Sequence, residues 1–222
     1  MLNEFVRQEA RPLPVILMLD VSGSMYSDGK INALNASVKE MLETFSEEDS
    51  IKAEIHVSIV TFGGRANLHT DLKPAREITF TDMSANGGTP LGEALDIVTE
   101  LINNKEKLPS RSYRPSIILV SDGQPNDSQW EAKLQSFIES GRTAKCDRWS
   151  LGIGQDADMS MLQTFMNDPE KRVFKAEDAN QISKFFRFIT STSIARTKSQ
   201  NPNVVTKEQK TFDPFAGEDL TY

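Results

Sequence analysis

The stretch from Val15 to Met25, VILMLDVSGSM, decides the fold of this chain, because an apolar run passes directly into polar residues. Residues 15–19 are apolar at every position, which is typical of a strand covered on both faces in a parallel sheet. The residues from Asp20 onward then present one carboxylate and two hydroxyls, spaced two residues apart around a glycine. A buried strand that ends in oxygen donors predicts a ligand site at the carboxyl edge of a sheet.

On both sides of this segment, short apolar runs alternate with longer stretches of helical period, which predicts an α/β fold with a mostly parallel sheet. Gly63-Gly64 predicts a tight hairpin that leads into one antiparallel edge strand, residues 65–70. The other predicted strands are 15–19, 55–62, 117–120, 147–154 and 173–174. The predicted helices are 30–45, 89–104, 128–140, 160–166 and 180–197.

Two helix starts carry capping signals. Thr89 is a plausible N-cap with Pro90 in the first turn, and Ser128 with Glu131 has the spacing of a capping box. Residues 1–11 form a lead-in and 12–197 one domain. The polar segment 198–222 lacks regular periodicity and is expected to be a flexible tail.

Composition narrows the class of protein. The 222 residues carry a formal net charge of -7, and no cluster of Lys and Arg stands out along the sequence, so nucleic acid is an unexpected partner. Cys146 is the single cysteine, which excludes an internal disulfide and fits a reducing compartment. The N-terminus lacks the apolar stretch of a signal peptide, and the longest apolar run is too short to span a bilayer. We expect a soluble, cytoplasmic protein without membrane contact.

Oxygen donors follow two of the predicted parallel strands. If these strands are neighbours, Asp20 and Asp122 converge on one rim with the hydroxyls of Ser22, Ser24 and Thr89. Carboxylate, hydroxyl and water oxygens suit hard divalent cations, Mg²⁺ above all, and two acids roughly balance one dication. These protein oxygens leave one coordination position of the metal open, and a carboxylate of another molecule can fill it.

These residues resemble the metal-ion-dependent adhesion site of von Willebrand factor type A domains. The resemblance rests on the D-x-S-x-S at residues 20–24, the Gly-Gly-Thr-Pro loop at 87–90 and the Ser-Asp-Gly at 121–123, in the family's order, and it covers roughly residues 12–197. It implies a doubly wound, six-stranded sheet with one antiparallel edge strand, helices on both faces, and Mg²⁺ or Mn²⁺ on the upper rim.

The resemblance also implies roles for the site residues. Ser22 and Ser24 would ligate the metal directly, Asp20 mainly through water, and Thr89 and Asp122 would move in and out of the coordination sphere. An acidic side chain of a protein partner would complete the octahedron. The residues expected to form the partner-binding rim around the metal are Gly23, Met25, Gly88 and Gly123.

Among such domains, the chain resembles the stand-alone bacterial TerY-like group of tellurium-resistance and stress-response operons. Some members carry a C-terminal zinc ribbon, which a chain with one cysteine cannot form. The group's association with kinases and phosphatases encoded nearby implies an adaptor in a phosphorylation circuit.

Other interpretations of the same residues stay open. Asp20, Ser22 and Asp122 are also ordinary turn formers, and Thr89 is explained by capping alone. A structural subunit with a stabilising metal is one alternative. A Mg²⁺-dependent phosphohydrolase is a weaker one, because Ser22 stands where such enzymes need a second acid and no positioned lysine is evident. A serine hydrolase is also disfavoured, because Ser22 and Ser24 do not stand in a G-x-S-x-G motif. We therefore expect that the chain is not an enzyme.

Overall fold

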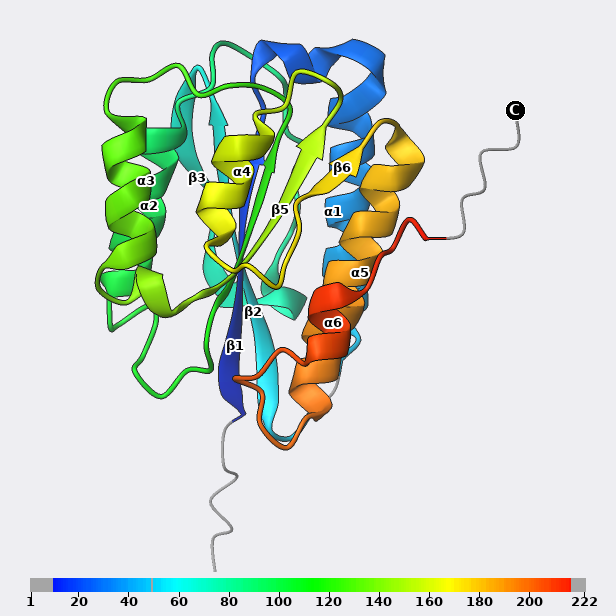
Figure 1. The fold of residues 1–222 in the computed structure, drawn as a ribbon. Helices are drawn as coiled ribbons and strands as arrows, with labels where there is room; N and C mark the ends of the chain where they lie inside the picture. Colours follow the sequence, from blue (N-terminus) through cyan, green and yellow to red (C-terminus); the bar gives the residue numbers. More distant parts are fainter. Residues whose placement is uncertain (1–9, 49, 217–222) are drawn as a thin grey trace, which may run out of the picture.

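The computed structural model describes residues 10–48 and 50–216 (Figure 1). Its strands are β1 (Arg11–Asp20), β2 (Ala53–Gly63), β3 (Arg65–Pro74), β4 (Ser116–Ser121), β5 (Asp147–Ile153) and β6 (Phe174–Ala176). Its helices are α1 (Lys30–Ser46), α2 (Leu91–Asn103), α3 (Trp130–Glu139), α4 (Met159–Met166), α5 (Ala179–Lys198) and α6 (Lys207–Thr211). None of these described helices combines the length and the apolar character that a membrane span requires.

The strands form one six-stranded sheet in the order β3-β2-β1-β4-β5-β6, and β3 alone among them is antiparallel to its neighbour. The predicted fold class is confirmed. Because β1 pairs with β2 on one side and with β4 on the other, the crossovers diverge between β1 and β4. The carboxyl ends of these two strands are therefore where a doubly wound sheet offers a ligand site.

Helices cover both faces of the sheet (Figure 1), and the alternation of β1 side chains explains the two layers. Val15 and Leu17 pack into an apolar cluster that includes residues of α1 and α5. Ile16 and Met18 face the other way, into a cluster with residues of α2, α3 and α4. All four side chains are fully buried, so β1 is the centre of both cores and its end is held in a fixed position.

The first strand begins earlier than the predicted Val15, within the expected lead-in. Pro12 and Pro14 lack the N–H that an inner strand needs for pairing on both sides. Residues 11–14, however, pair only with β2, whereas pairing with β4 starts at Val15. The Pro12 carbonyl points to the β4 side, where it accepts a hydrogen bond from Tyr113 N at 2.8 Å. The two prolines therefore lack their N–H groups on the side of β1 where no neighbouring strand would accept a hydrogen bond from them.

Both predicted helix caps are wrong. Helix α2 has Pro90 at its N-cap. In its first turn, the Glu93 N–H donates a hydrogen bond of 3.2 Å to Oδ2 of Asp127, which lies in the loop after β4. Helix α3 starts one residue later than the predicted box allows, with Gln129 at the N-cap in the left-handed region (φ 65°) and no side-chain cap. In the first case a distant carboxylate replaces the local cap that Thr89 would have provided.

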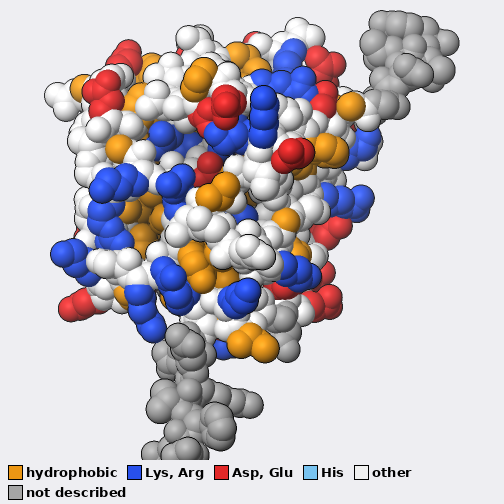
Figure 2. Space-filling model, turned by 60° about the horizontal axis from the view of Figure 1, so that its bottom comes forward, with side chains coloured by type: hydrophobic (Ala, Val, Ile, Leu, Met, Phe, Trp, Pro, Cys, Tyr) orange, Lys and Arg blue, Asp and Glu red, His pale blue; other side chains and the backbone are white. Residues whose placement is uncertain are grey.

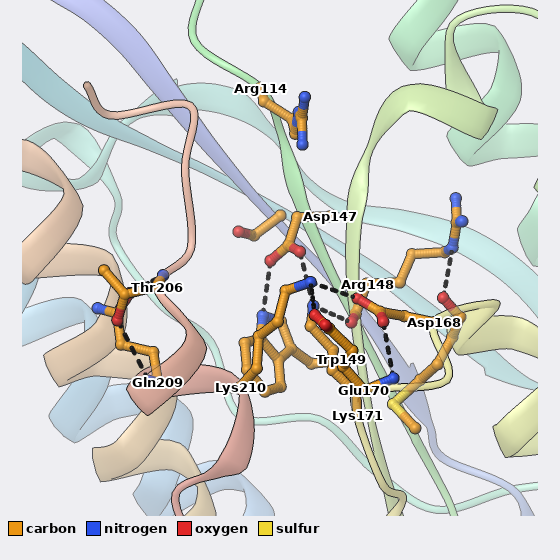
Figure 3. Close-up of polar contacts among 12 residues, drawn as sticks. Arg114, Asp147, Arg148, Trp149, Asp168, Glu170, Lys171, Thr206, Gln209 and Lys210 are labelled. Atoms are coloured by element: carbon orange, nitrogen blue, oxygen red, sulfur yellow. Dashed lines mark hydrogen bonds and ion pairs between the residues drawn. The ribbon is translucent and has the colours of Figure 1, made fainter.

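The C-terminal segment contains regular structure that the sequence did not predict. Helix α6 carries a capping box between Thr206 and Gln209, and it lies against α5 (Figures 1 and 3). Lys210 forms ion pairs with Asp168 (3.0 Å) and Glu170 (2.9 Å) in the loop before β6. The expected tail therefore packs on the domain over its described part, and residues 217–222 lie outside the described residues.

Aromatic side chains hold this segment. Phe212 stacks on Phe188 of α5 at a ring-centroid distance of 5.5 Å, and Phe215 meets Phe174 of β6 edge to face at 6.1 Å. Aromatic pairs of this kind contribute about 0.5–1.5 kcal/mol each beyond the area they bury. Two scattered phenylalanines are too few to give a periodic signal, which explains why the sequence predicted no ordered packing here.

Candidate metal site

Asp20 and Asp122 lie side by side at the carboxyl edge of the sheet. Leu19 pairs with Val120 in the register of β1 and β4, so Asp20 ends its strand beside Ser121, and Asp122 follows. Both acids are buried, with exposed fractions of 0% and 1%. The assumption that these two strands are neighbours is correct, and the structure brings both carboxylates to the switch point.

Hydrogen bonds fix the orientation of Asp20. Its Oδ1 accepts from the Ser22 N–H at 2.8 Å, and its Oδ2 accepts from the Ser121 hydroxyl at 2.6 Å. Burial raises the pKa of Asp20, against the lowering effect of these hydrogen bonds, and the nearby charge of Asp122 raises it further. A buried carboxylate beside a second one is costly unless a cation balances the charge.

A chain of hydrogen bonds joins the hydroxyls to Asp122. Ser22 Oγ lies 3.0 Å from Ser24 Oγ, and the Ser24 hydroxyl donates to Asp122 Oδ1 at 2.7 Å. Ser22 is buried, whereas Ser24 is exposed. The cluster of Asp20, Ser22, Ser24 and Asp122 is therefore continuous, and it opens to solvent at Ser24.

Thr89 reaches the rim through its backbone contacts. Its N–H donates to Asn126 Oδ1 at 3.0 Å, and its carbonyl accepts from the Asn126 N–H at 3.1 Å. Within the described part of the chain, no hydrogen bond joins the Thr89 hydroxyl to the other four predicted ligands. A Cβ at Gly88 would lie 2.3 Å from Asn126 Nδ2, so glycine at this position lets Asn126 hold the threonine.

The loop before Thr89 is tied to the ends of β1 and β2. The Gly23 N–H donates to the Gly87 carbonyl at 2.8 Å, and the Gly64 N–H donates to the Gly88 carbonyl at 2.9 Å. Gly87 has φ +68°, and a Cβ there would lie 2.4 Å from Gly64 Cα. Only a residue without a side chain allows these loops to approach so closely, and this approach carries Thr89 toward the carboxylates.

Lys30, the first residue of α1, is a site residue that sequence reasoning missed. Its Nζ lies 2.8 Å from Asp122 Oδ2, and its side chain is 19% exposed. A lysine in the first turn is unfavourable with respect to the helix dipole, so its position after D-x-S-x-S could have pointed to an acidic partner. The ammonium neutralises one of the two buried carboxylates and leaves one negative charge.

The predicted partner-binding rim needs one correction. Gly23 is exposed, and Gly88 and Gly123 are half-buried, but Met25 is fully buried within the apolar cluster beneath α1. Its side chain stabilises the turn that follows Ser24 and is not available to a partner. The next residue, Tyr26, is 80% exposed and takes the surface place that we expected for Met25.

The donor set fits a hard divalent cation. Two buried carboxylates and up to three hydroxyls offer oxygen ligands, the chemistry that Mg²⁺ and Mn²⁺ prefer. Among the described residues, no group of three or more His, Cys, Asp and Glu is arranged to hold a metal. This is expected for a set built on two acids and several hydroxyls, because such a site relies on hydroxyl oxygens and water for most of its ligands.

A doubly wound sheet with a D-x-S-x-S turn and a second aspartate at its switch point is typical of a protein-interaction fold that often carries a metal site. The profile of the von Willebrand factor type A domain matches residues 15–188. The chain belongs to this family.

Curated relatives match most of this chain over a small part of their own length. Inter-alpha-trypsin inhibitor heavy chain H2 from Sus scrofa is 27% identical over 96% of this chain and 24% of that protein. Calcium-activated chloride channel regulator 1 from Bos taurus is 25% identical over 81% of this chain and 19% of that protein. The chain thus spans about a quarter or less of the length of these relatives.

Solved structures share the fold. A von Willebrand factor type A protein from Catenulispora acidiphila superimposes with a TM-score of 0.65 at 21% identity, over 83% of this chain and 43% of that one. Proximal thread matrix protein 1 from the mussel byssus, whose metal-ion-dependent adhesion site (MIDAS) motif is occupied by zinc, gives a TM-score of 0.64 at 17% identity. The match covers 84% of this chain and 48% of that one.

Proposed function

We propose that the rim is a divalent-cation site and that the chain is a non-enzymatic, metal-dependent protein-binding adaptor. Ser22 and Ser24 would hold the ion through their hydroxyls, Asp20 mainly through water, and Thr89 and Asp122 as the site opens and closes. Mg²⁺ or Mn²⁺ would supply a Lewis-acidic position for a Glu or Asp carboxylate of the partner.

One observation carries the proposal. Two buried aspartates share a hydrogen-bonded cluster with two serines, and a single ammonium balances only one of their charges. Such a cluster is stabilised by a cation and is open to one at Ser24. The zinc-occupied motif of the mussel byssus protein shows that a relative of this fold holds a divalent metal, which supports the same chemistry here.

The partner that we propose is a protein with an exposed acidic residue, such as a kinase or phosphatase encoded nearby. We place the adaptor in the cytoplasm, in a bacterial stress-response circuit of the tellurium-resistance type. The basis of this narrower proposal is the sequence resemblance to the TerY-like group.

The structure adds one argument to the enzyme alternative and one against it. Lys30 supplies the positioned lysine that the sequence did not reveal. Asp20, however, is fully buried, and both of its oxygens accept hydrogen bonds, so it is poorly placed to attack a phosphoryl group. We expect no hydrolysis of p-nitrophenyl phosphate above the rate without protein, at any Mg²⁺ concentration.

The direct test is Mn²⁺ binding, followed by the loss of the free-ion signal in electron paramagnetic resonance. We expect one site in the wild type, and at least tenfold weaker binding in Asp122→Asn and Ser24→Ala. Ser27→Ala is the matched control, because Ser27 is exposed on the same turn and outside the cluster. Absence of binding in the wild type, or equal affinity in all four proteins, would rule out the proposed site.

Partner capture tests the adaptor role. Tagged wild type and Ser24→Ala are incubated with lysate of the source organism, in Mg²⁺ or in chelator, and bound proteins are identified by mass spectrometry. A partner held by metal-loaded wild type alone supports the adaptor. If chelator lowers thermal stability but leaves the captured proteins unchanged, the structural-subunit alternative is the better account.

A further inference from the structure

The edge of the sheet opposite the metal site gathers basic side chains that are scattered in the sequence. Arg114 precedes β4, Arg142 and Lys145 lie between α3 and β5, and Arg148 is the second residue of β5. Figure 2 shows this face, with Lys and Arg side chains around hollows in which hydrophobic side chains are visible. These residues form no cluster along the sequence and meet only in the folded chain, which as a whole is acidic.

A hollow of about 240 Å³ lies within this face. Side chains with polar groups line it from Ser112, Tyr113, Arg114, Arg142, Lys145 and Asn203, and the remaining lining residues are apolar. Of the described residues that line it, none is acidic. One water occupies roughly 30 Å³ in the liquid, so the hollow has room for a tetrahedral oxyanion with several waters.

Among the described residues, the cations of the hollow have no carboxylate partner. Within the part of the chain that the structure describes, Arg114, Arg142 and Lys145 form no ion pair. The neighbouring hollow, which shares Arg114 and Lys145 and measures about 520 Å³, behaves differently. There Asp147 pairs with Lys171 at 2.6 Å, and Figure 3 shows Arg114 apart from that pair. Its second acid, Asp168, pairs with Lys210 at 3.0 Å, so both acids of this hollow already have a cationic partner.

Two buried donors also lack acceptors. Arg142 donates through Nη2 to the Leu108 carbonyl at 2.8 Å, but its Nη1 is buried without a hydrogen-bond partner among the described residues. The Ser112 hydroxyl is in the same condition. A buried donor without an acceptor costs about 1–3 kcal/mol, more when the group is charged. Small rotations of these side chains would turn both donors toward an acceptor in the hollow.

We propose that this hollow is a binding site for a phosphate-class oxyanion, held by Arg142 and Ser112 and attracted by Arg114 and Lys145. Free phosphate and a phosphorylated protein side chain share this chemistry. A nucleic-acid backbone is the less favoured ligand, because one small hollow in a chain of net charge -7 accommodates a single anionic group and not a continuous strand.

The test is calorimetric titration of the full chain at constant ionic strength with inorganic phosphate, with a neutral peptide that carries one phosphoserine, and with its unphosphorylated twin. We expect the wild type to bind phosphate or the phosphopeptide, and not chloride or the twin. Arg142→Gln is expected to weaken binding by roughly tenfold or more, the loss of one charge-assisted hydrogen bond. The tighter of the two probes identifies the source of the phosphate.

Variants on the same face separate a built site from general electrostatic attraction. Lys145→Gln changes an exposed lining residue and should weaken binding by about threefold while the protein stays folded. Lys52→Gln removes an equally exposed charge that does not line the hollow, and should change affinity by less than about twofold. Equal losses in Lys145→Gln and Lys52→Gln, tighter binding of an oligonucleotide than of either phosphate probe, or no phosphate binding at all would overturn the proposal.

Discussion

Replacing Lys30 by methionine should increase the affinity of the rim for Mg²⁺. The Lys30 ammonium contacts Asp122 Oδ2 at 2.8 Å, so it occupies a carboxylate that the proposed metal site also uses. A dication and an ammonium that share one carboxylate would lie about 5 Å apart and repel each other by about 7 kcal/mol at an effective dielectric constant of about 20. The two cations therefore compete for Asp122.

The observed penalty should be smaller than this repulsion, because Lys30 can move away. Its stem is flexible and its side chain is 19% exposed, so the ammonium can turn into water when the metal enters. The metal then has to overcome the loss of one charge-assisted hydrogen bond, about 1.5–3 kcal/mol. Since 1.4 kcal/mol corresponds to a factor of ten, we expect Lys30→Met to bind Mg²⁺ about 10- to 100-fold more tightly.

Isothermal titration of chelator-treated protein with Mg²⁺ measures this effect. Lys30→Arg keeps the charge and should bind nearly as the wild type does, and Lys39→Met removes an exposed lysine from the same helix without touching the site. Unchanged or weaker Mg²⁺ binding in Lys30→Met, with both controls at the wild-type value, would refute the competition and indicate that the lysine orients Asp122 for the metal.

Three further outcomes are expected. Burial raises the pKa of the Cys146 thiol to about 12, so iodoacetamide at pH 8 should alkylate this thiol only after denaturation. Because the thiol ionises at lower pH in the unfolded chain than in the folded one, the free energy of unfolding should fall as pH rises from about 9 toward 12. Gly87→Ala should lower the free energy of unfolding by about 1–3 kcal/mol in urea, because of its positive φ and its contact with Gly64, whereas Gly123→Ala has open space and should be neutral. Phe212→Ala should speed trypsin cleavage within α6, because its ring stacks on α5; a cleavage rate equal to the wild type would contradict that packing.

Local chemistry explains what the sequence could predict. An apolar strand followed directly by Asp20, Ser22 and Ser24 places polar groups at the strand's end whatever the rest of the chain does. The alternation of strands and helices then brings Asp122 to the same edge. The convergence of these four residues was predictable because it depends on strand direction and order, which leave few alternatives.

Contacts between distant loops explain what was missed. Lys30 and Asp122 are 92 residues apart, and Asn126 is 37 residues from the Thr89 that it holds. No periodicity or spacing links such pairs, because they meet only when several loops pack at one edge. Thr89 is a related case, since its local cap signal is overruled by Asp127, which takes over the N–H of Glu93.

Lys30 also bears on the choice between an adaptor and a structural subunit. Two buried carboxylates without any cation would strongly destabilise the fold, and metal removal would then unfold the domain. The ammonium at 2.8 Å balances Asp122, and the two hydrogen bonds to Asp20 partly offset its burial, so the chain itself supplies a counter-charge to this cluster. On the proposed function, removal of the metal should therefore change what the rim binds more than whether the domain folds. A site arranged in this way suits reversible capture of a partner better than permanent stabilisation.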